Sequence, residues 1–124
     1  MNEIIEKEEF LIEDMIYEVR GMQVMLDSDL AKLYKVETKR INEVVKNNPD
    51  KFPERFSFIM TNLEKTNLWS KFSTANISSN SRSNPRVFTE QGIYMLATIL
   101  KSKVATGVSI AIMDRYICKN ATLY

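Results

Sequence analysis

The spacing of hydrophobic positions predicts two short helices joined by a tight connection between residues 26 and 48. Asp27 and Ser28 can accept hydrogen bonds from the free N–H groups of a first helical turn, and positions 30, 31, 33 and 34 continue an apolar helical face, which predicts a helix over 28–34. Val36 is the apolar residue of the connection and is expected to fill the corner. A second helix over 38–48 has one apolar stripe, formed by Ile41, Val44 and Val45.

The polar face of the second helix carries side chains of the kinds that read base edges or clamp phosphates. They are Thr38, Lys39, Arg40, Asn42, Glu43, Lys46 and Asn47. This layout is typical of a helix-turn-helix with an exposed recognition helix. A structural helix pair also needs an apolar inner face and a solvated outer face, so that interpretation stays open.

Shorter patterns predict the elements that follow and precede this pair. Residues 16–26 read as two strands that turn at Arg20-Gly21, and residues 56–60 as a third strand. The third strand is expected to place three apolar residues on one face: Phe56, Phe58 and Met60. Thr61 and Glu64 have capping-box spacing, which predicts a helix over 62–72.

Two apolar helices are expected near the C-terminus, forming a hairpin that supplies most of the core. Thr89 can cap a helix over 90–100, in which Gly92 allows a close backbone approach and the buried residues are Ile93, Leu96, Ala97 and Leu100. Ser102 can open a last helix over 103–119. Its inward residues are expected to be Val104, Val108, Ala111, Ile112 and Tyr116.

Residues 73–86 are rich in serine and asparagine and contain no acid, so they cannot pack a core and predict a surface loop or hairpin. Arg82 and Arg86 lie in this interval. As a wing or arm, the interval would lay both arginines on DNA phosphates or in a minor groove. As a solvated linker, it would have no such role. Both interpretations are open.

Charge is unevenly distributed. Residues 1–18 hold seven acids and one base, so residues 19–124 hold 16 bases and 9 acids, a net charge of +7. A basic body behind an acidic leader suits a polyanionic partner, because releasing counterions from phosphates drives much of nucleic-acid affinity. The same surplus of bases also serves solubility in many proteins.

Length and composition predict one domain over 15–119, with an acidic leader over 1–14 and a tail over 120–124. The single cysteine, Cys118, has no partner for an internal disulfide, and the acidic N-terminus does not read as a secretory signal, so we expect a cytoplasmic protein. The apolar region over 93–112 is interrupted by Lys101 and Lys103 and reads as two core helices rather than a membrane span.

The composition argues against an enzyme. The chain has no histidine, no glycine-rich phosphate loop and no partner that would activate Cys118 as a nucleophile. Glu37-Thr38-Lys39 has a spacing that some nucleases use, with Asp27 or Asp29 upstream, but the helix turn explains these residues better. No catalytic residue, metal site or cofactor is expected.

Together these segments resemble the ORF-six-N domain of phage and bacterial proteins, which is related to the KilA-N and Bro-N domains. The matching segments are Arg20-Gly21, Val24-Met25-Leu26-Asp27, Asp29-Leu30-Ala31-Lys32-Leu33-Tyr34, Val36-Glu37-Thr38-Lys39-Arg40, Phe52-Pro53-Glu54 with Phe56, Phe58 and Thr61, and Phe88-Thr89-Glu90-Gln91-Gly92 with Met95-Leu96. The resemblance covers roughly residues 12–118. It implies a DNA-binding α+β domain of phage regulators, antirepressors and mobile-element proteins.

We therefore expect a winged-helix-like α+β domain that binds double-stranded DNA sequence-specifically, with a helix-turn-helix, a small antiparallel sheet and a C-terminal helical hairpin. Arg40 or Asn42 would read a base, while Lys39 and Lys46 would engage phosphates. The polar interval with Arg82 and Arg86 would act as wing or arm. The alternative is a protein-interaction module that binds a repressor or a second copy without binding DNA by itself.

Overall fold

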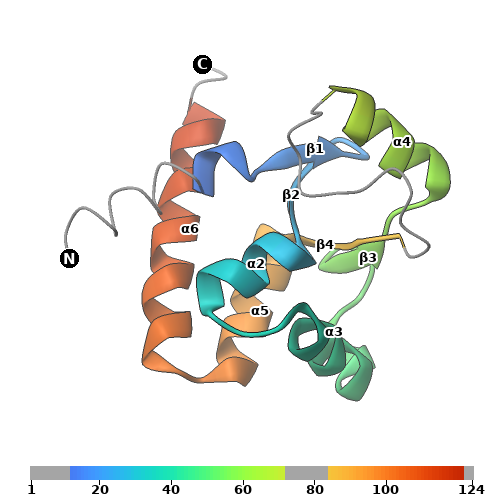
Figure 1. Cartoon of the computed structure of the whole chain (residues 1–124). Helices are drawn as coiled ribbons and strands as arrows, with labels where there is room; N and C mark the ends of the chain where they lie inside the picture. Colours follow the sequence, from blue (N-terminus) through green and yellow to red (C-terminus); the bar gives the residue numbers. More distant parts are fainter. Residues whose placement is uncertain (1–11, 72–83, 122–124) are drawn as a thin grey trace.

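A computed structural model describes residues 12–71 and 84–121 and shows helices arranged around a four-stranded antiparallel sheet (Figure 1). Residues 12–14 are helical. The further elements are β1 (Tyr17–Val19), β2 (Met22–Leu26), α2 (Asp27–Tyr34), α3 (Thr38–Asn47), the 3-10 turn η1 (Pro49–Lys51), β3 (Ser57–Ile59), α4 (Asn62–Lys71), β4 (Arg86–Thr89), α5 (Glu90–Leu100) and α6 (Lys103–Ala121). The predicted α+β class, the small antiparallel sheet and the C-terminal helical hairpin are confirmed.

The hairpin of β1 and β2 turns where the sequence predicted, at Arg20 and Gly21. Both residues have positive φ angles, +56° and +74°, as a type I′ turn requires, and this turn matches the twist of the flanking strands. Arg20 is not a glycine, so this conformation is strained for it, but its side chain makes three contacts with two residues, Phe58 and Glu64. Its guanidinium lies 3.9 Å from the centre of the Phe58 ring, and its Nε and Nη2 donate to Glu64 at 2.7 and 3.1 Å.

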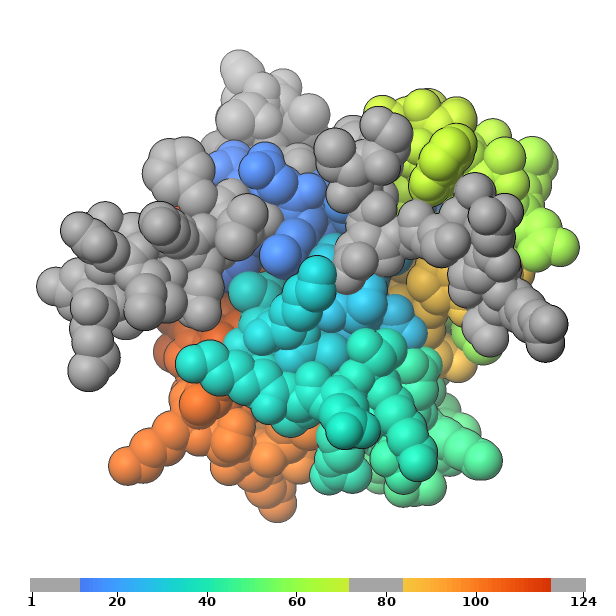
Figure 2. All heavy atoms as spheres, in the orientation of Figure 1, coloured from blue at the N-terminus to red at the C-terminus, as the bar shows by residue number. Residues whose placement is uncertain are grey.

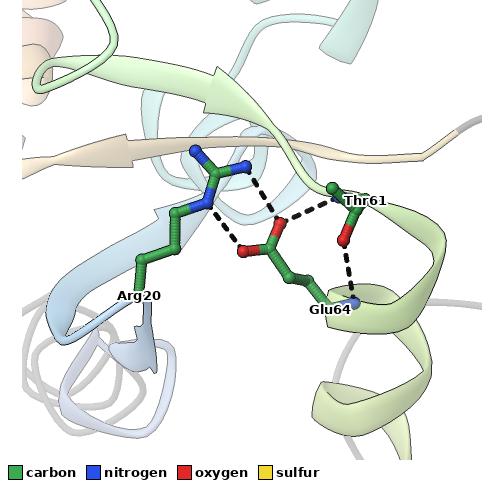
Figure 3. A network of polar contacts seen from close by, with 3 residues as sticks. All are labelled: Arg20, Thr61 and Glu64. Carbon is green, nitrogen blue, oxygen red and sulfur yellow. Dashed lines mark hydrogen bonds and ion pairs between the residues drawn. The ribbon is translucent and has the colours of Figure 1, made fainter.

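Glu64 also completes the predicted capping box of α4. Its carboxylate accepts from the Thr61 N–H at 2.9 Å, and its own N–H donates to the Thr61 hydroxyl at 3.2 Å (Figure 3). The hydrogen bond from Arg20, more than the bonds from Thr61, holds the pKa of Glu64 below its usual value. The network therefore joins the β1–β2 turn to the start of α4.

The strand β4 was not predicted, because Val87 and Phe88 read only as an approach to the following helix. The sheet order is β1-β2-β4-β3, so this short segment pairs with two strands. Met25 lies opposite Phe88 on one side, and Phe58 lies opposite Val87 on the other. Four residues bounded by a polar interval give little sequence signal for a central strand.

The sheet separates two hydrophobic clusters. Met25 and Phe88 point into the larger cluster, which contains buried residues of α2, α3, α5 and α6. Neighbouring strand residues point the opposite way, so Leu26 and Val87 join a second cluster with Leu68 of α4. Helices thus cover both faces of the sheet.

The predicted face of the third strand is only partly right. Phe58 and Met60 are buried in the cluster beneath α4, whereas Phe56 packs against the other cluster. The reason is that Phe56 precedes β3 and belongs to a turn in which the Pro53 carbonyl accepts from the N–H groups of both Phe56 and Ser57. Strand alternation therefore begins one residue later than expected.

The prediction for α5 holds in part, because Ala97 and Leu100, which were expected to be buried, are only half-buried. Thr89 caps α5 by accepting from the Gly92 N–H, and Ile93 and Leu96 are fully buried. A Cβ on Gly92 would collide with the Phe56 carbonyl, which confirms the expected close backbone approach.

The inward face of α6 differs from the prediction. Val104 is 42% exposed, and the buried stripe consists of Ala105, Ser109, Ile112 and Tyr116, while Val108 and Ala111 are half-buried. Ser109 turns inward because its hydroxyl shares a buried 2.8 Å hydrogen bond with the Tyr34 hydroxyl of α2. The predicted set does not include Ser109, and its first two residues, Val104 and Val108, lie one position before the buried Ala105 and Ser109.

The Tyr34–Ser109 hydrogen bond predicts the stability of paired variants. Tyr34→Phe should lower the free energy of unfolding by about 1–3 kcal/mol, because the buried Ser109 hydroxyl loses its partner. Adding Ser109→Ala should recover part of that loss, since it removes the unpaired hydroxyl. Urea denaturation of both variants near pH 8 measures the difference. A double variant that loses as much as the two single variants combined would contradict the pairing.

The same tyrosine predicts a loss of stability in alkali. Burial raises the pKa of Tyr34 to about 12, from about 10 in an unfolded chain. Below about pH 10 the hydroxyl is neutral in both states, whereas between about pH 10 and 12 the unfolded chain ionises first, so stability falls as pH rises. The slope of unfolding free energy against pH should be shallower in Tyr34→Phe than in the wild type. Equal slopes would contradict this prediction.

Candidate nucleic-acid interface

The connection between α2 and α3 is fixed by the backbone. Lys35 ends α2 in the left-handed region at φ +59°, its N–H donates to the Lys32 carbonyl at 3.3 Å, and the Val36 N–H donates to the Ala31 carbonyl at 3.0 Å. These two bonds form a Schellman motif. Val36 packs against the larger cluster, which confirms its predicted place in the corner.

The α3 helix is anchored through its predicted apolar stripe. Ile41, Val44 and Val45 are all buried in the larger cluster. The helix ends at Asn47, one residue earlier than expected, and Pro49 starts the 3-10 turn that follows. The opposite face is thereby directed away from the core.

Five of the seven predicted recognition-helix residues are exposed, namely Lys39, Arg40, Glu43, Lys46 and Asn47. In Figure 2 the α2–α3 segment, coloured cyan to green, occupies the centre of the face in view. Within residues 12–71 and 84–121, no ion pair engages the cations of this set. The side of α3 that faces solvent therefore carries three unpaired positive charges.

Asn42 lies at the edge of this face, and Thr38 is half-buried beside it. The Asn42 amide donates to the Asp27 carboxylate at 2.9 Å and to the Thr38 carbonyl at 3.1 Å, so both amide hydrogens are used inside the protein. Bidentate reading of adenine needs an amide that is free to donate as well as accept. Between the two predicted base readers, the geometry therefore favours Arg40.

Asp27 was predicted to cap the first helix, but Leu26 occupies the N-cap position and α2 begins one residue earlier, at Asp27 itself. The Asp27 side chain is buried. One carboxylate oxygen accepts from the Ser28 N–H at 2.8 Å, and the other accepts from Asn42 at 2.9 Å and from the Arg86 N–H at 3.4 Å. A residue that looked like a local cap thus joins α2, α3 and β4.

The two predicted wing arginines have different places. Arg86 belongs to β4 rather than to a loop, is half-buried, and donates from Nη1 to the Ser57 hydroxyl at 3.1 Å. Burial lowers the pKa of Arg86, and the nearby Asp27 opposes that shift. Arg82, together with residues 73–83 of the candidate wing, lies outside the described residues.

Around the α2–α3 pair, the exposed residues carry a more positive net charge than the whole segment does. Between residues 27 and 51 there are six bases and five acids, but Asp27 and Asp29 are buried while all six bases are exposed. The exposed acids are Glu37, Glu43 and Asp50. The candidate set missed three of the six exposed bases: Lys32, Lys35 and Lys51. These lysines are exposed because of how α2 packs and how the chain turns after α2 and α3. Helical spacing in the sequence does not predict either feature.

The described part of the chain contains no group of three or more histidine, cysteine, aspartate or glutamate side chains that could hold a metal ion. In the same part, no helix combines the length and apolar character needed to cross a membrane.

Comparison with known proteins identifies a family. No curated protein and no solved structure matches the chain. The family model of the ORF6N domain matches residues 14–99, which include the sheet and the helices α2 and α3. Because this match covers well over half of the sequence, the chain belongs to the ORF6N domain family.

Proposed function

We propose that this ORF6N domain binds double-stranded DNA sequence-specifically, as part of a phage-type transcriptional regulator or antirepressor. The α2–α3 pair would act as a helix-turn-helix, with α3 in the major groove. The observation that carries the proposal is the division of α3 into a face buried through Ile41, Val44 and Val45 and a solvent face with unpaired Lys39 and Arg40.

Each exposed side chain of α3 has a suitable partner in DNA. A guanidinium pairs bidentately with guanine, so Arg40 is the proposed base reader, and Glu43 can accept from a cytosine amino group. Lys39 and Lys46 would contact phosphates on either side. Asn47 and Thr38 would contribute hydrogen bonds at the two ends of the helix.

The first turn of α3 supports a phosphate contact there. Glu37 occupies the N-cap position without a side-chain hydrogen bond to the helix, and no acidic residue lies within the first turn. The Arg40 N–H donates to the Glu37 carbonyl at 2.9 Å, so the N–H groups of Thr38 and Lys39 are the ones that no side chain caps, and helix N-termini favour anionic groups. The proposed wing, with Arg82, would add contacts to the DNA backbone or minor groove.

Neither catalysis nor a cofactor is part of the proposed function, because the sequence lacks histidine and offers no activated nucleophile. The proposed place of action is the cytoplasm, where phage and bacterial DNA is available. The proposed partner is double-stranded DNA.

A protein-interaction module is the second candidate function. Val104 and Ile110 of α6 are 42% and 60% exposed, which gives the C-terminal hairpin an apolar outer surface. Under this alternative the domain would bind a repressor protein through that surface and would not bind DNA by itself.

DNA affinity should depend on salt and on the exposed cations of α3. The chain should bind random-sequence duplex with an affinity that falls steeply with salt, as measured by fluorescence anisotropy at several salt concentrations. Lys46→Ala should weaken binding to all sequences and reduce the salt slope by about 1. Lys71→Ala, on α4 across the sheet, removes the same charge and should leave affinity nearly unchanged. Absence of binding at low salt would contradict DNA binding and favour the protein-interaction module.

Sequence preference should depend on Arg40. Arg40→Ala should cost about 1–3 kcal/mol of binding free energy on a selected site and relax the preference at one base pair. Site selection from a random duplex pool, followed by titration of the selected and mutated sites, measures both effects. Unchanged affinity together with unchanged preference would remove α3 from the recognition role.

The Asp27–Asn42 hydrogen bond should position α3. Asp27→Asn should lower the free energy of unfolding by about 1.5–3 kcal/mol, because the new amide group faces donors. It should also weaken discrimination between sites while leaving the salt slope unchanged, since no phosphate contact is removed. The swapped variant Asp27→Asn with Asn42→Asp restores a carboxylate–amide pair and should recover part of the stability. No recovery would contradict the positioning role.

A further inference from the structure

One side of α6 is not covered by any other described element. Its buried stripe, Ala105, Ser109, Ile112 and Tyr116, faces the core. The positions on the opposite side of the helix follow each other at spacings of four, three and four residues, and all are exposed: Lys103, Gly107, Ile110 and Asp114. Figure 1 shows α6 along one side of the molecule.

An open apolar hollow of about 320 Å³ borders this stripe. It lies between α5 and α6 and is lined by Tyr94, Ala97, Thr98, Thr106, Ile110 and Met113, among others. Tyr94 is 65% exposed and Ile110 is 60% exposed. Two large apolar side chains therefore stand in solvent beside one hollow.

Among the described residues, nothing packs against Gly107 closely enough to require a glycine there. A Cβ at this position would meet nothing within 4 Å, and the residue lies inside a helix, where glycine costs about 1 kcal/mol relative to alanine. A Cβ can therefore be added at this position without a collision among the described residues. The glycine becomes useful where another surface approaches α6 closely.

We propose that the exposed stripe of α6 pairs with the same stripe of a second copy of this chain, in antiparallel orientation. A two-fold axis between residues 108 and 109 places Ile110 of one copy against the partner's Gly107, because the two positions are equidistant from that axis. The same axis places Lys103 against the partner's Asp114. The spacing of four, three and four residues is that of the a and d positions along a helix seam.

Both pairs are complementary. The Ile110 side chain fills the space that a glycine leaves on the partner helix, and opposite charges meet at both ends of the seam. Because of the two-fold symmetry, each pair occurs two times in the dimer, as an isologous interface requires. Parallel pairing would instead bring each lysine beside a lysine and each aspartate beside an aspartate.

The interface is expected to be weak. One helix stripe with its bordering hollow covers less than the roughly 1,200–2,000 Å² that stable complexes bury, so we expect association in the micromolar range. The surface belongs to α6 rather than to α3, and the proposal does not rest on DNA binding.

Charge reversal with rescue tests the pairing. Sedimentation of the full chain without DNA, over a range of concentrations, should show a monomer–dimer equilibrium. Lys103→Glu and Asp114→Lys should each weaken dimerisation roughly tenfold, because two like-charge contacts replace two attractive ones. The double variant Lys103→Glu with Asp114→Lys should return to within about threefold of the wild type.

Gly107→Leu tests the close approach independently of charge. Circular dichroism and thermal unfolding should show an intact fold, because a Cβ at position 107 points into open space. Dimerisation should fall by more than about tenfold, because the space for Ile110 is filled. A wild-type chain that stays monomeric at all concentrations would overturn the proposal, as would a dimer insensitive to Lys103→Glu and Gly107→Leu. Because the assay contains no DNA, either result is independent of the proposed DNA binding.

Discussion

The arrangement of the α2–α3 pair on the sheet depends on one buried carboxylate. Removing an aspartate from water costs several kcal/mol unless its oxygens receive hydrogen bonds, and Asp27 receives them from Ser28, Asn42 and Arg86. Its place in the first turn of α2 adds the favourable end of the helix dipole. Because the three donors belong to α2, α3 and β4, satisfying the charge also fixes how these elements meet.

A single hydrophobic cluster supports both proposed surfaces. Ile41 and Val44 of α3 and Ile112 and Tyr116 of α6 belong to the same buried set. The exposed faces of α3 and α6 point in different directions. The shared cluster therefore holds in place both the proposed DNA-binding surface and the proposed dimerisation surface. The Tyr34–Ser109 bond adds a polar link between α2 and α6 within that cluster.

Local signals in the sequence were sufficient for the elements they define. Arg20-Gly21 predicted the β1–β2 turn, Thr61 and Glu64 predicted the start of α4, and Thr89 predicted the start of α5, because each depends on residues within one turn of the chain. The apolar stripe of α3 was equally readable, since burial there follows simple helical spacing.

Features that depend on partners distant in sequence could not be predicted from local sequence patterns. The strand β4 is defined by its neighbours β2 and β3, and a four-residue segment does not reveal them. Ser109 faces inward only because Tyr34 offers a partner 75 residues away in sequence. In the candidate site, the exposed cations of α3 were predicted, but the engagement of Asn42 by Asp27 required the three-dimensional arrangement.

The position of β4 between β2 and β3 also determines the order in which the elements can assemble during synthesis of the chain. The β1–β2 hairpin and the α2–α3 pair form from neighbouring residues, whereas β4 must insert between β2 and β3 after α4 and the polar interval have been made. At roughly 5–20 residues per second, a ribosome needs a few seconds to pass from α3 to the end of β4. Throughout that time Asp27 lacks the N–H of Arg86, so a nascent chain carries the α2–α3 pair before it carries the strand that holds the pair in place.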